Sequence, residues 1–131
     1  MKIYLDVDGT ITIHKYPNIG VLNEGCFEVI RKLQDAGHEI ILNTYRANCD
    51  DNTLEEAIEF LKNEPKILPI LKIEKRKVRP IPWNWEVFKE KNLLFIDDIC
   101  EGSPLRSEKD SEWDVVDWEA IDKEFIANGL Y

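Results

Sequence analysis

The first ten residues place two carboxylates at the end of a short apolar run. Residues 2–7 read Lys-Ile-Tyr-Leu-Asp-Val, and Asp8, Gly9 and Thr10 follow directly. Side chains alternate along a β-strand, so Asp6 and Asp8 are expected to face the same spot. Two like charges that close repel each other unless one is protonated or a cation lies between them. Packing gives no reason for such a pair, so it predicts a chemical function.

The length and composition of the chain predict one domain over residues 1–131, with a core of its own. The net charge of −9 argues against binding to nucleic acid or to an anionic membrane. The charge is uneven, because residues 66–91 hold eight basic and three acidic residues, a local charge of +5 that leaves −14 elsewhere. This stretch could attract an anionic substrate, or its Lys and Arg side chains could protect an edge strand.

The cysteines and the N-terminus indicate a cytoplasmic location. Cys26, Cys49 and Cys100 are odd in number and too widely spaced for a zinc site, which favours a reducing compartment. The first acidic residue is Asp6, which is too close to the N-terminus for a signal peptide. No apolar run approaches the roughly 18 residues of a membrane span. We therefore expect no contact with a membrane.

Short apolar runs alternate with segments of helical periodicity. The predicted strands cover residues 2–7, 38–43, 67–73, 92–96 and 114–116; helices are predicted at 23–36, from 53 to before Pro65, at 83–91 and from 117. Thr53 and Glu56 are expected to form a capping box at the start of the second helix. This alternation predicts an α/β fold in three layers, with a mostly parallel sheet covered by helices on both faces.

Polar residues follow three of the predicted strands. They are Asp6 and Asp8 after the first, Asn43, Thr44 and Arg46 after the second, and Asp97 and Asp98 after the fourth. The carboxyl ends of parallel strands lie on one rim of a sheet, and ligands bind there. We therefore expect these residues to form one site.

The sequence Asp6-Val-Asp8-Gly9-Thr10 resembles the first signature of the haloacid dehalogenase (HAD) superfamily of aspartate-nucleophile phosphohydrolases. Thr44 resembles its second signature. Lys89 lies where the lysine of the third is expected, with Lys91, Lys77 and Lys72 as alternatives. Asp97-Asp98 after Leu-Leu-Phe-Ile resembles the acidic fourth signature. The resemblance implies a Rossmann-like HAD fold.

The resemblance also implies an activity, that of a magnesium-dependent phosphomonoesterase. Asp6 attacks phosphorus to form an aspartyl-phosphate, and Asp8 serves as the acid and base. Thr44 and Lys89 hold the phosphate oxygens. The substrate is then a phosphorylated small molecule or an exposed phosphate on a larger one.

The remaining roles follow from the same resemblance. Mg²⁺ is held by Asp6, by the backbone carbonyl of Asp8 and by Asp97, with Asp98 binding through water or orienting other groups. The amides of Gly9 and Thr10 help to bind phosphate, although the Thr10 hydroxyl could instead stabilise a turn. Arg46 contacts the substrate or braces a loop. We expect His14 to be a surface or packing residue.

The gaps between these signatures leave no room for the cap domain that larger HAD enzymes carry. An open site could accept a large substrate, or a second subunit could cover it. Trp83 and Trp85 are candidates for such a homo-oligomer contact, with core packing as the alternative. Two other functions stay open: a non-catalytic module that binds phosphate and magnesium, and a phosphotransferase.

Overall fold

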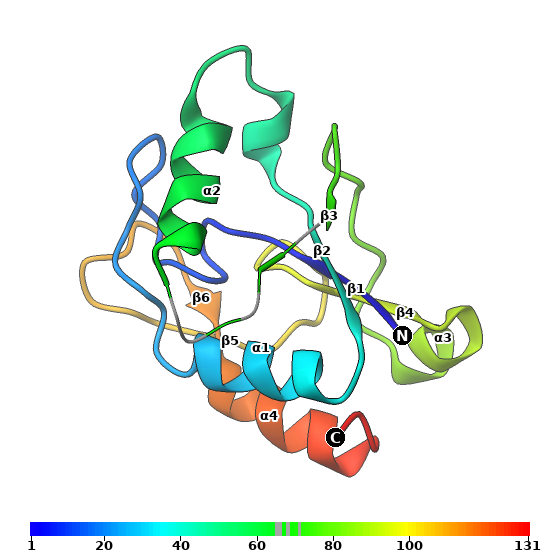
Figure 1. Cartoon of the computed structure of the whole chain (residues 1–131). Helices are drawn as coiled ribbons and strands as arrows, with labels where there is room; N and C mark the ends of the chain where they lie inside the picture. The colour runs from blue at the N-terminus through cyan, green and yellow to red at the C-terminus, as the bar shows by residue number, and fades with distance from the viewer. Residues whose placement is uncertain (65–66, 68, 71) are drawn as a thin grey trace.

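A computed structural model describes residues 1–131 of the chain apart from 65, 66, 68 and 71 (Figure 1). Its centre is a parallel sheet in the order β3-β2-β1-β4, formed by β1 (Lys2–Leu5), β2 (Glu39–Leu42), β3 (Lys72–Ile73) and β4 (Leu93–Ile96). Side chains of the neighbouring strands β1 and β4, such as Ile3, Leu5, Leu94 and Ile96, are fully buried. Strands buried on both faces are typical of sheets that helices cover on both sides.

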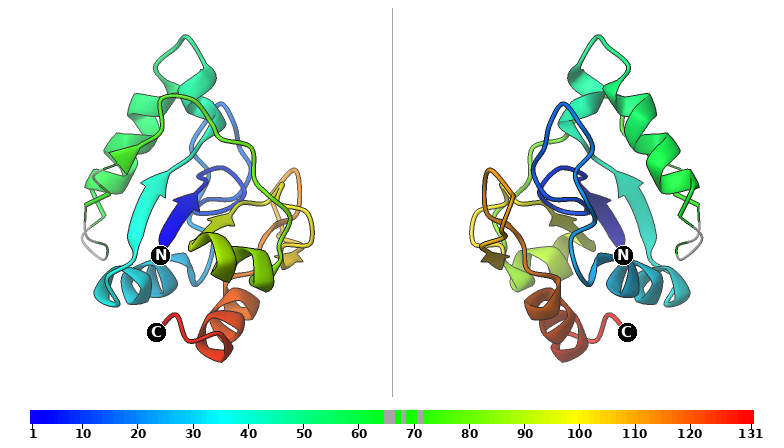
Figure 2. Two further views of the ribbon diagram at one scale, coloured as in Figure 1. Left: turned by 90° about the vertical axis from the view of Figure 1, so that its right-hand side faces the viewer. Right: turned by 90° about the vertical axis from the view of Figure 1, so that its left-hand side faces the viewer.

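The helices are α1 (Cys26–Asp35), α2 (Thr53–Lys62), α3 (Trp85–Lys91) and α4 (Trp118–Ala127). Figure 1 shows α2 and α3 on opposite sides of the sheet, and Figure 2 shows α3 in front of the strands in one view and behind them in the other. Helices α1 and α4 lie side by side, joined by an ion pair of 3.1 Å between Lys32 and Asp122. The predicted α/β architecture, with a parallel sheet flanked by helices, is confirmed.

The register of the sheet brings the polar strand ends together. Leu5 pairs with Leu42 on one side and with Ile96 on the other. The amide of Asp6 donates to the carbonyl of Ile96 at 3.0 Å, and the amide of Asn43 donates to the carbonyl of Leu5 at 2.8 Å. The residues that follow these three strands therefore lie on one rim, as the sequence predicts.

Helix α1 confirms its predicted apolar face, since Cys26, Val29, Ile30 and Leu33 are all buried. Gly37 follows it with a φ of 85°, a left-handed conformation that glycine adopts without strain. β1 ends two residues earlier than predicted and β2 one residue earlier, because the residues that follow form the rim, and β2, β4 and β6 each begin one residue later than predicted. The prediction of a strand over 67–73 partly lies outside the described residues, and a small antiparallel pair, β5 (Leu105–Arg106) with β6 (Val115–Val116), was not predicted at 105–106.

The predicted capping box at the start of α2 is wrong. The residue before the helix is Asn52, and its side chain makes no capping hydrogen bond. Instead Asp51 accepts hydrogen bonds from both the amide (3.0 Å) and the hydroxyl (2.7 Å) of Thr53. An aspartate two residues upstream satisfies the same backbone donor, and its carboxylate also suits the positive end of the helix.

The loop after β1 folds tightly against the second half of the chain. The carbonyl of Val7 accepts from the amides of Thr10 (3.1 Å) and Ile11 (2.9 Å). The carbonyl of Thr10 accepts from the indole N–H of Trp118 at 2.7 Å and from the amide side chain of Asn23 at 3.0 Å. These bonds fix the backbone that carries Asp8 and Gly9. No helix in the described part of the chain is long and apolar enough to cross a membrane.

Candidate active site

Three carboxylates converge at the rim. Asp6, Asp97 and Asp98 each offer a carboxylate oxygen, and these oxygens all lie within 4.8 Å of one another. Asp6 is 4% exposed and Asp97 is 1% exposed. The Oδ2 atom of Asp97 is buried without a hydrogen bond, although a lysine ammonium lies near it. Buried carboxylates this close repel one another, so the cluster needs a cation or protons.

The pKa values of two of these carboxyl groups reflect that repulsion. Burial, and then the nearby charge of Asp97, raise the pKa of Asp6 well above its usual range. Burial also raises the pKa of Asp97, to about 6, while the neighbouring Lys77 opposes the rise. A bound cation would favour the charged forms of both groups.

Lys77 is the lysine that reaches the carboxylates. Its Nζ lies 2.8 Å from Asp97 Oδ2 and 3.3 Å from Asp6 Oδ1. These two carboxylates raise the pKa of Lys77 against the opposing effect of burial, which keeps its charge in place. The ammonium therefore supplies part of the positive charge that the cluster requires.

Two asparagine side chains hold the backbone around Lys77. Asn48 accepts from the amide of Lys77 at 2.9 Å. Asn43 accepts from the amide of Val78 at 2.7 Å and donates to the carbonyl of Val78 at 2.9 Å. Asn43 directly follows β2, and Asn48 ends the short helix η1 (Tyr45–Asn48). The segment after β3 is thus fixed across the rim, although it has no regular structure.

The structure corrects the expected position of Lys89. This residue lies on α3, is exposed, and is not among the groups that contact the carboxylates in the described part of the chain. Lys77 takes the place expected for Lys89. The sequence did not show which of the two lysines reaches the carboxylates. Lys77 lies in an irregular segment whose path depends on its contacts with Asn43 and Asn48.

The Asp8 carboxylate pairs with Arg46. The guanidinium donates from Nε to Asp8 Oδ2 at 2.8 Å and from Nη2 to Asp8 Oδ1 at 2.7 Å. The sequence predicts that one of the two acids is protonated or that a cation lies between them; in the structure each acid contacts a cation of its own, Lys77 for Asp6 and Arg46 for Asp8. β1 ends at Leu5, so strict alternation does not extend to residue 8. The Asp8 carboxylate is also not part of the carboxylate cluster among the described residues.

Arg46 is fully buried, and all five of its N–H groups have acceptors. Besides Asp8, it donates to the carbonyls of Pro17 (3.2 Å), Asn18 (2.9 Å) and Thr53 (3.1 Å). Five donors are all that a guanidinium has. Of the two roles expected for Arg46, the structure supports loop bracing, because a substrate would have to displace an existing bond.

Thr44, Gly9 and Thr10 lie at the same rim. The Thr44 hydroxyl oxygen accepts from the amide of Arg46 at 3.2 Å, and its hydrogen is left to donate within the described residues. The Thr10 hydroxyl donates to Asp6 Oδ2 at 3.3 Å. The Thr10 amide is bound to Val7, so it is not free to hold phosphate as expected.

His14 was expected to be a surface or packing residue, but it makes a specific contact with a carboxylate of the site. Its Nε2 lies 2.7 Å from Asp98 Oδ2, and both side chains are largely buried. The two groups meet directly over Gly9, where an added Cβ would lie 2.1 Å from His14 Nε2. Gly9 thus allows a close approach as well as a positive φ of 78°. Nothing in the local sequence around His14 indicates this contact.

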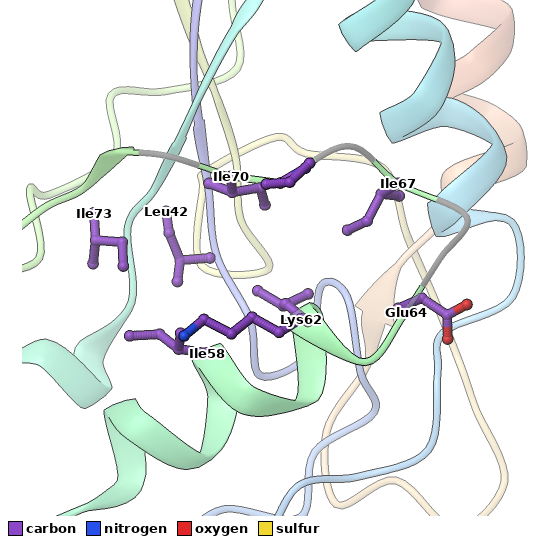
Figure 3. Close-up of a pocket in the computed structure, with 9 residues that line it drawn as sticks. Leu42, Ile58, Lys62, Glu64, Ile67, Ile70 and Ile73 are labelled. Atoms are coloured by element: carbon purple, nitrogen blue, oxygen red, sulfur yellow. The ribbon is translucent and has the colours of Figure 1, made fainter.

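Two hollows differ in their relation to this site. One, of about 510 Å³, is lined in part by Lys77, the residue that contacts Asp6 and Asp97. The other, of about 230 Å³, lies between α2 and β3 and is lined mainly by apolar side chains, including Leu42, Ile58 and Ile73 (Figure 3). The lining of the second hollow includes no residue that contacts the carboxylates, whereas Lys77 connects the first hollow to them.

Trp83 and Trp85 pack within the molecule. Both indole N–H groups donate to Glu124 Oε1, at 3.1 and 2.9 Å. Their rings contact those of Phe88 and Phe125. These contacts favour core packing over the oligomer surface that was the other expectation.

The residues of the cluster fit a divalent cation with oxygen ligands. The observation is that Asp6, Asp97 and Asp98 each offer an oxygen within 4.8 Å of the others, and that the buried Oδ2 of Asp97 accepts no hydrogen bond and contacts only the Lys77 ammonium as an ion pair among the described residues. Carboxylate oxygens are the ligands that Mg²⁺ prefers. Asp6 and Asp97 would bind directly, while His14 holds one oxygen of Asp98.

Comparison with known proteins gives one structural relative. The chain resembles a solved structure described as "Structure of the conserved protein coded by locus from Bacteroides thetaiotaomicron", with a TM-score of 0.61 and 26% identity over 98% of this chain and 91% of that one. No known family profile matches the sequence. No curated protein matches it either. The likeness supports the fold and carries no statement of function.

Replacing Arg46 is expected to destabilise the protein. Arg46→Gln leaves Asp8 and buried carbonyls without their donors, so the free energy of unfolding should fall by about 3 kcal/mol. Urea unfolding followed by circular dichroism measures this. The matched control is Arg31→Gln, which removes an exposed pair with Asp35 and should cost less than about 1 kcal/mol. Equal losses in the two variants would contradict the bracing role.

The carboxylate cluster predicts a pH dependence of stability. The pKa of Asp97 is about 6 in the folded protein and 3.8 in its ordinary state. Because this pKa is raised by folding, the contribution of Asp97 to the free energy of unfolding is most favourable at low pH, where the folded and unfolded proteins are both protonated. That contribution is lost as the pH rises through 6. Relative to wild type, metal-free Asp97→Asn should therefore gain stability between about pH 4.5 and about pH 7.5. Denaturant unfolding with a chelator measures the difference.

An exposed acid provides the control for this experiment. Asp50 lies in the loop before α2 and is exposed, so Asp50→Asn should show no such gain. If Asp97→Asn instead lost stability relative to wild type as the pH rose, then the Asp97 carboxylate would be net stabilising and the argument from repulsion would be wrong.

Proposed function

We propose that this chain is a magnesium-dependent phosphomonoesterase of the haloacid dehalogenase type, acting through an aspartyl-phosphate on Asp6. The observation that carries the proposal is the cluster of Asp6, Asp97 and Asp98 with the Lys77 ammonium against two of them. Such a set can hold a divalent cation and the negative oxygens of a phosphate together. The sequence resemblance supports the same conclusion, and the structural relative is neutral about it.

In the proposed reaction an oxygen of Asp6 attacks phosphorus, and the bond between phosphorus and the leaving oxygen breaks. Asp8 gives a proton to that oxygen and later takes one from the water that hydrolyses the aspartyl-phosphate. Mg²⁺, when bound, would offset the repulsion between the phosphate and the carboxylates. Lys77 and the Thr44 hydroxyl would hold phosphate oxygens.

The residues around Asp6 and Asp8 have distinct parts in this scheme. Thr10 donates to Asp6 Oδ2, which leaves Oδ1 as the oxygen nearer to Lys77. Arg46 fixes the carboxylate of Asp8 by two bonds. Each Asp8 oxygen keeps a second lone pair, so it can still exchange a proton. Arg46 is thus a positioning residue in this scheme.

The site would be open, without a cap domain. Neither the loop between β1 and α1 (residues 6–25) nor the segment between β3 and α3 (residues 74–84) is long enough to form a folded domain. We also propose a cytoplasmic location, which rests on three cysteines that are all free thiols. That a second subunit covers the site stays a prediction, and measuring the oligomeric state would test it.

A second candidate function is a module that binds phosphate and magnesium without catalysis. The observation that favours it is that Arg46 already occupies both oxygens of Asp8, the group that must move protons. Phosphoryl transfer to an acceptor other than water is a third possibility. It would require water to be excluded from the hollow beside Lys77.

Phosphate release from a panel of phosphomonoesters tests the proposal. With Mg²⁺ present we expect turnover that a chelator abolishes, and Asp6→Asn should lower kcat by roughly a thousandfold or more. Acid quenching followed by mass spectrometry should find phosphate on Asp6. Folded wild-type protein that releases no phosphate from any ester would leave the binding module as the better reading.

Two lysine variants test the reassignment from Lys89 to Lys77. Lys77→Met removes the ammonium against Asp6 and Asp97, and it should lower kcat/KM by about a hundredfold. Lys89→Met makes the same change on the exposed face of α3 and should leave kcat/KM within about twofold of wild type. If Lys89→Met lowered kcat/KM more than Lys77→Met did, Lys89 would be the phosphate-binding lysine, as the sequence resemblance implies.

A further inference from the structure

The hollow beside Lys77 has more room than one phosphate group requires. Its volume is about 510 Å³, and its lining includes Asn48, Lys77, Arg79, Ile99 and Glu101. It borders the carboxylate cluster, because Lys77 lines it and also contacts Asp6 and Asp97. Pockets of this size hold small-molecule ligands. The part of a substrate beyond its reacting phosphate would therefore lie here.

The segment over this hollow is the most cationic part of an acidic chain. We call residues 75–79 the cationic loop; it contains Lys75, Arg76, Lys77 and Arg79 in a protein of net charge −9. Arg79 is exposed and forms no ion pair within the described residues, and the same holds for Lys75 and Arg76. A free guanidinium beside a phosphate site is suited to a second anion.

Protection of the sheet edge does not explain these charges. The edge strand β3 is Lys72–Ile73, and its lysine already pairs with Glu39. The cationic loop begins beyond the end of β3 and runs across the rim to Lys77. A solvated edge accounts for Lys72 but not for cations concentrated at the mouth of the site.

The loop presents Arg79 from a fixed backbone. Val78, the residue before it, is bound through both its amide and its carbonyl to the side chain of Asn43. Pro80 follows it and restricts the backbone. Beyond that, the carbonyl of Ile81 accepts from the thiol of Cys100 at 3.0 Å, and the amide of Trp83 donates to the carbonyl of Glu101 at 2.7 Å. The two walls of the hollow are thus joined, which reduces the entropy lost when a ligand binds.

We propose that this hollow binds a second phosphate on the leaving group, so that the preferred substrates are small bisphosphorylated molecules. The proposal rests on the phosphomonoesterase function proposed above. One phosphate would lie at the carboxylate cluster and contact Lys77, and the other would contact Arg79. Glu101 also lines the hollow, and its charge directs the second phosphate away from it.

Paired substrates test this inference. We would measure kcat/KM for fructose 1,6-bisphosphate, a nucleoside 3′,5′-bisphosphate and 2,3-bisphosphoglycerate, each beside its two monophosphates. At least one bisphosphate should be preferred about tenfold over its better monophosphate. The preference should shrink as salt rises from about 50 to about 500 mM, because an exposed guanidinium is screened. No preference in any of the three sets would overturn the proposal.

Charge variants assign the preference to the hollow. Arg79→Gln should lower the ratio of bisphosphate to monophosphate kcat/KM by about tenfold, and Glu101→Gln should raise it. The matched control is Arg31→Gln on α1, which should leave the ratio unchanged. A ratio that Arg79→Gln does not alter would refute the proposed contact.

A binding measurement separates this inference from the catalytic one. Calorimetry with Asp6→Asn, with and without Mg²⁺, gives the Kd for the same bisphosphates and monophosphates when no turnover occurs. Tighter binding of a bisphosphate that Arg79→Gln abolishes supports the hollow even if wild type releases no phosphate, in which case only the catalytic proposal fails. Equal Kd values for both ligand classes would refute the inference even if the enzyme is active.

Discussion

The mutual repulsion of buried carboxylates is the constraint on which this structure depends. The parallel register of β1 and β4 puts Asp6 beside Asp97, both nearly inaccessible to water, and Asp98 follows at once. Such a cluster is costly in an empty site, which is why the pKa values of Asp6 and Asp97 rise. The fold offsets this cost with one ammonium, delivered by a segment without regular structure. The same repulsion makes the site receptive to a divalent cation.

A second charge network fixes the loop after β1. Arg46 connects Asp8 with the carbonyls of Pro17 and Asn18 in that loop and of Thr53 at the start of α2. Removing any of these acceptors leaves a buried donor unpaired, so the three segments are stabilised together. Asp8 thereby has a defined orientation while Asp6 faces the cluster. The two acids of the first motif thus lie in different electrostatic surroundings, which suits the different roles that we propose for them.

The contacts around His14 and Lys77 show why local sequence reasoning missed His14 and preferred Lys89 to Lys77. His14 reaches Asp98 across 84 residues of chain, over a glycine whose missing side chain makes the space. Lys77 reaches Asp6 across 71 residues, and its path depends on Asn43 and Asn48. Neither segment has a periodic pattern, and periodicity is what predicts the direction of a side chain from sequence. Lys89, in a segment that does have a helical pattern, was the more visible candidate, but Lys77 is the lysine that contacts the carboxylates.

The sequence by itself determined the α/β architecture and the rim on which the polar residues meet. Apolar runs followed by acids or amides specify buried strands, and parallel strands put their carboxyl ends together. Tertiary structure alone decided how the charges pair: Lys77 rather than Lys89 with Asp6, Arg46 with Asp8, and His14 with Asp98. Strand position follows from local burial, but an ion pair between distant segments depends on the paths of the loops and on distances of a few ångströms. Those paths are set by hydrogen bonds that no local pattern encodes.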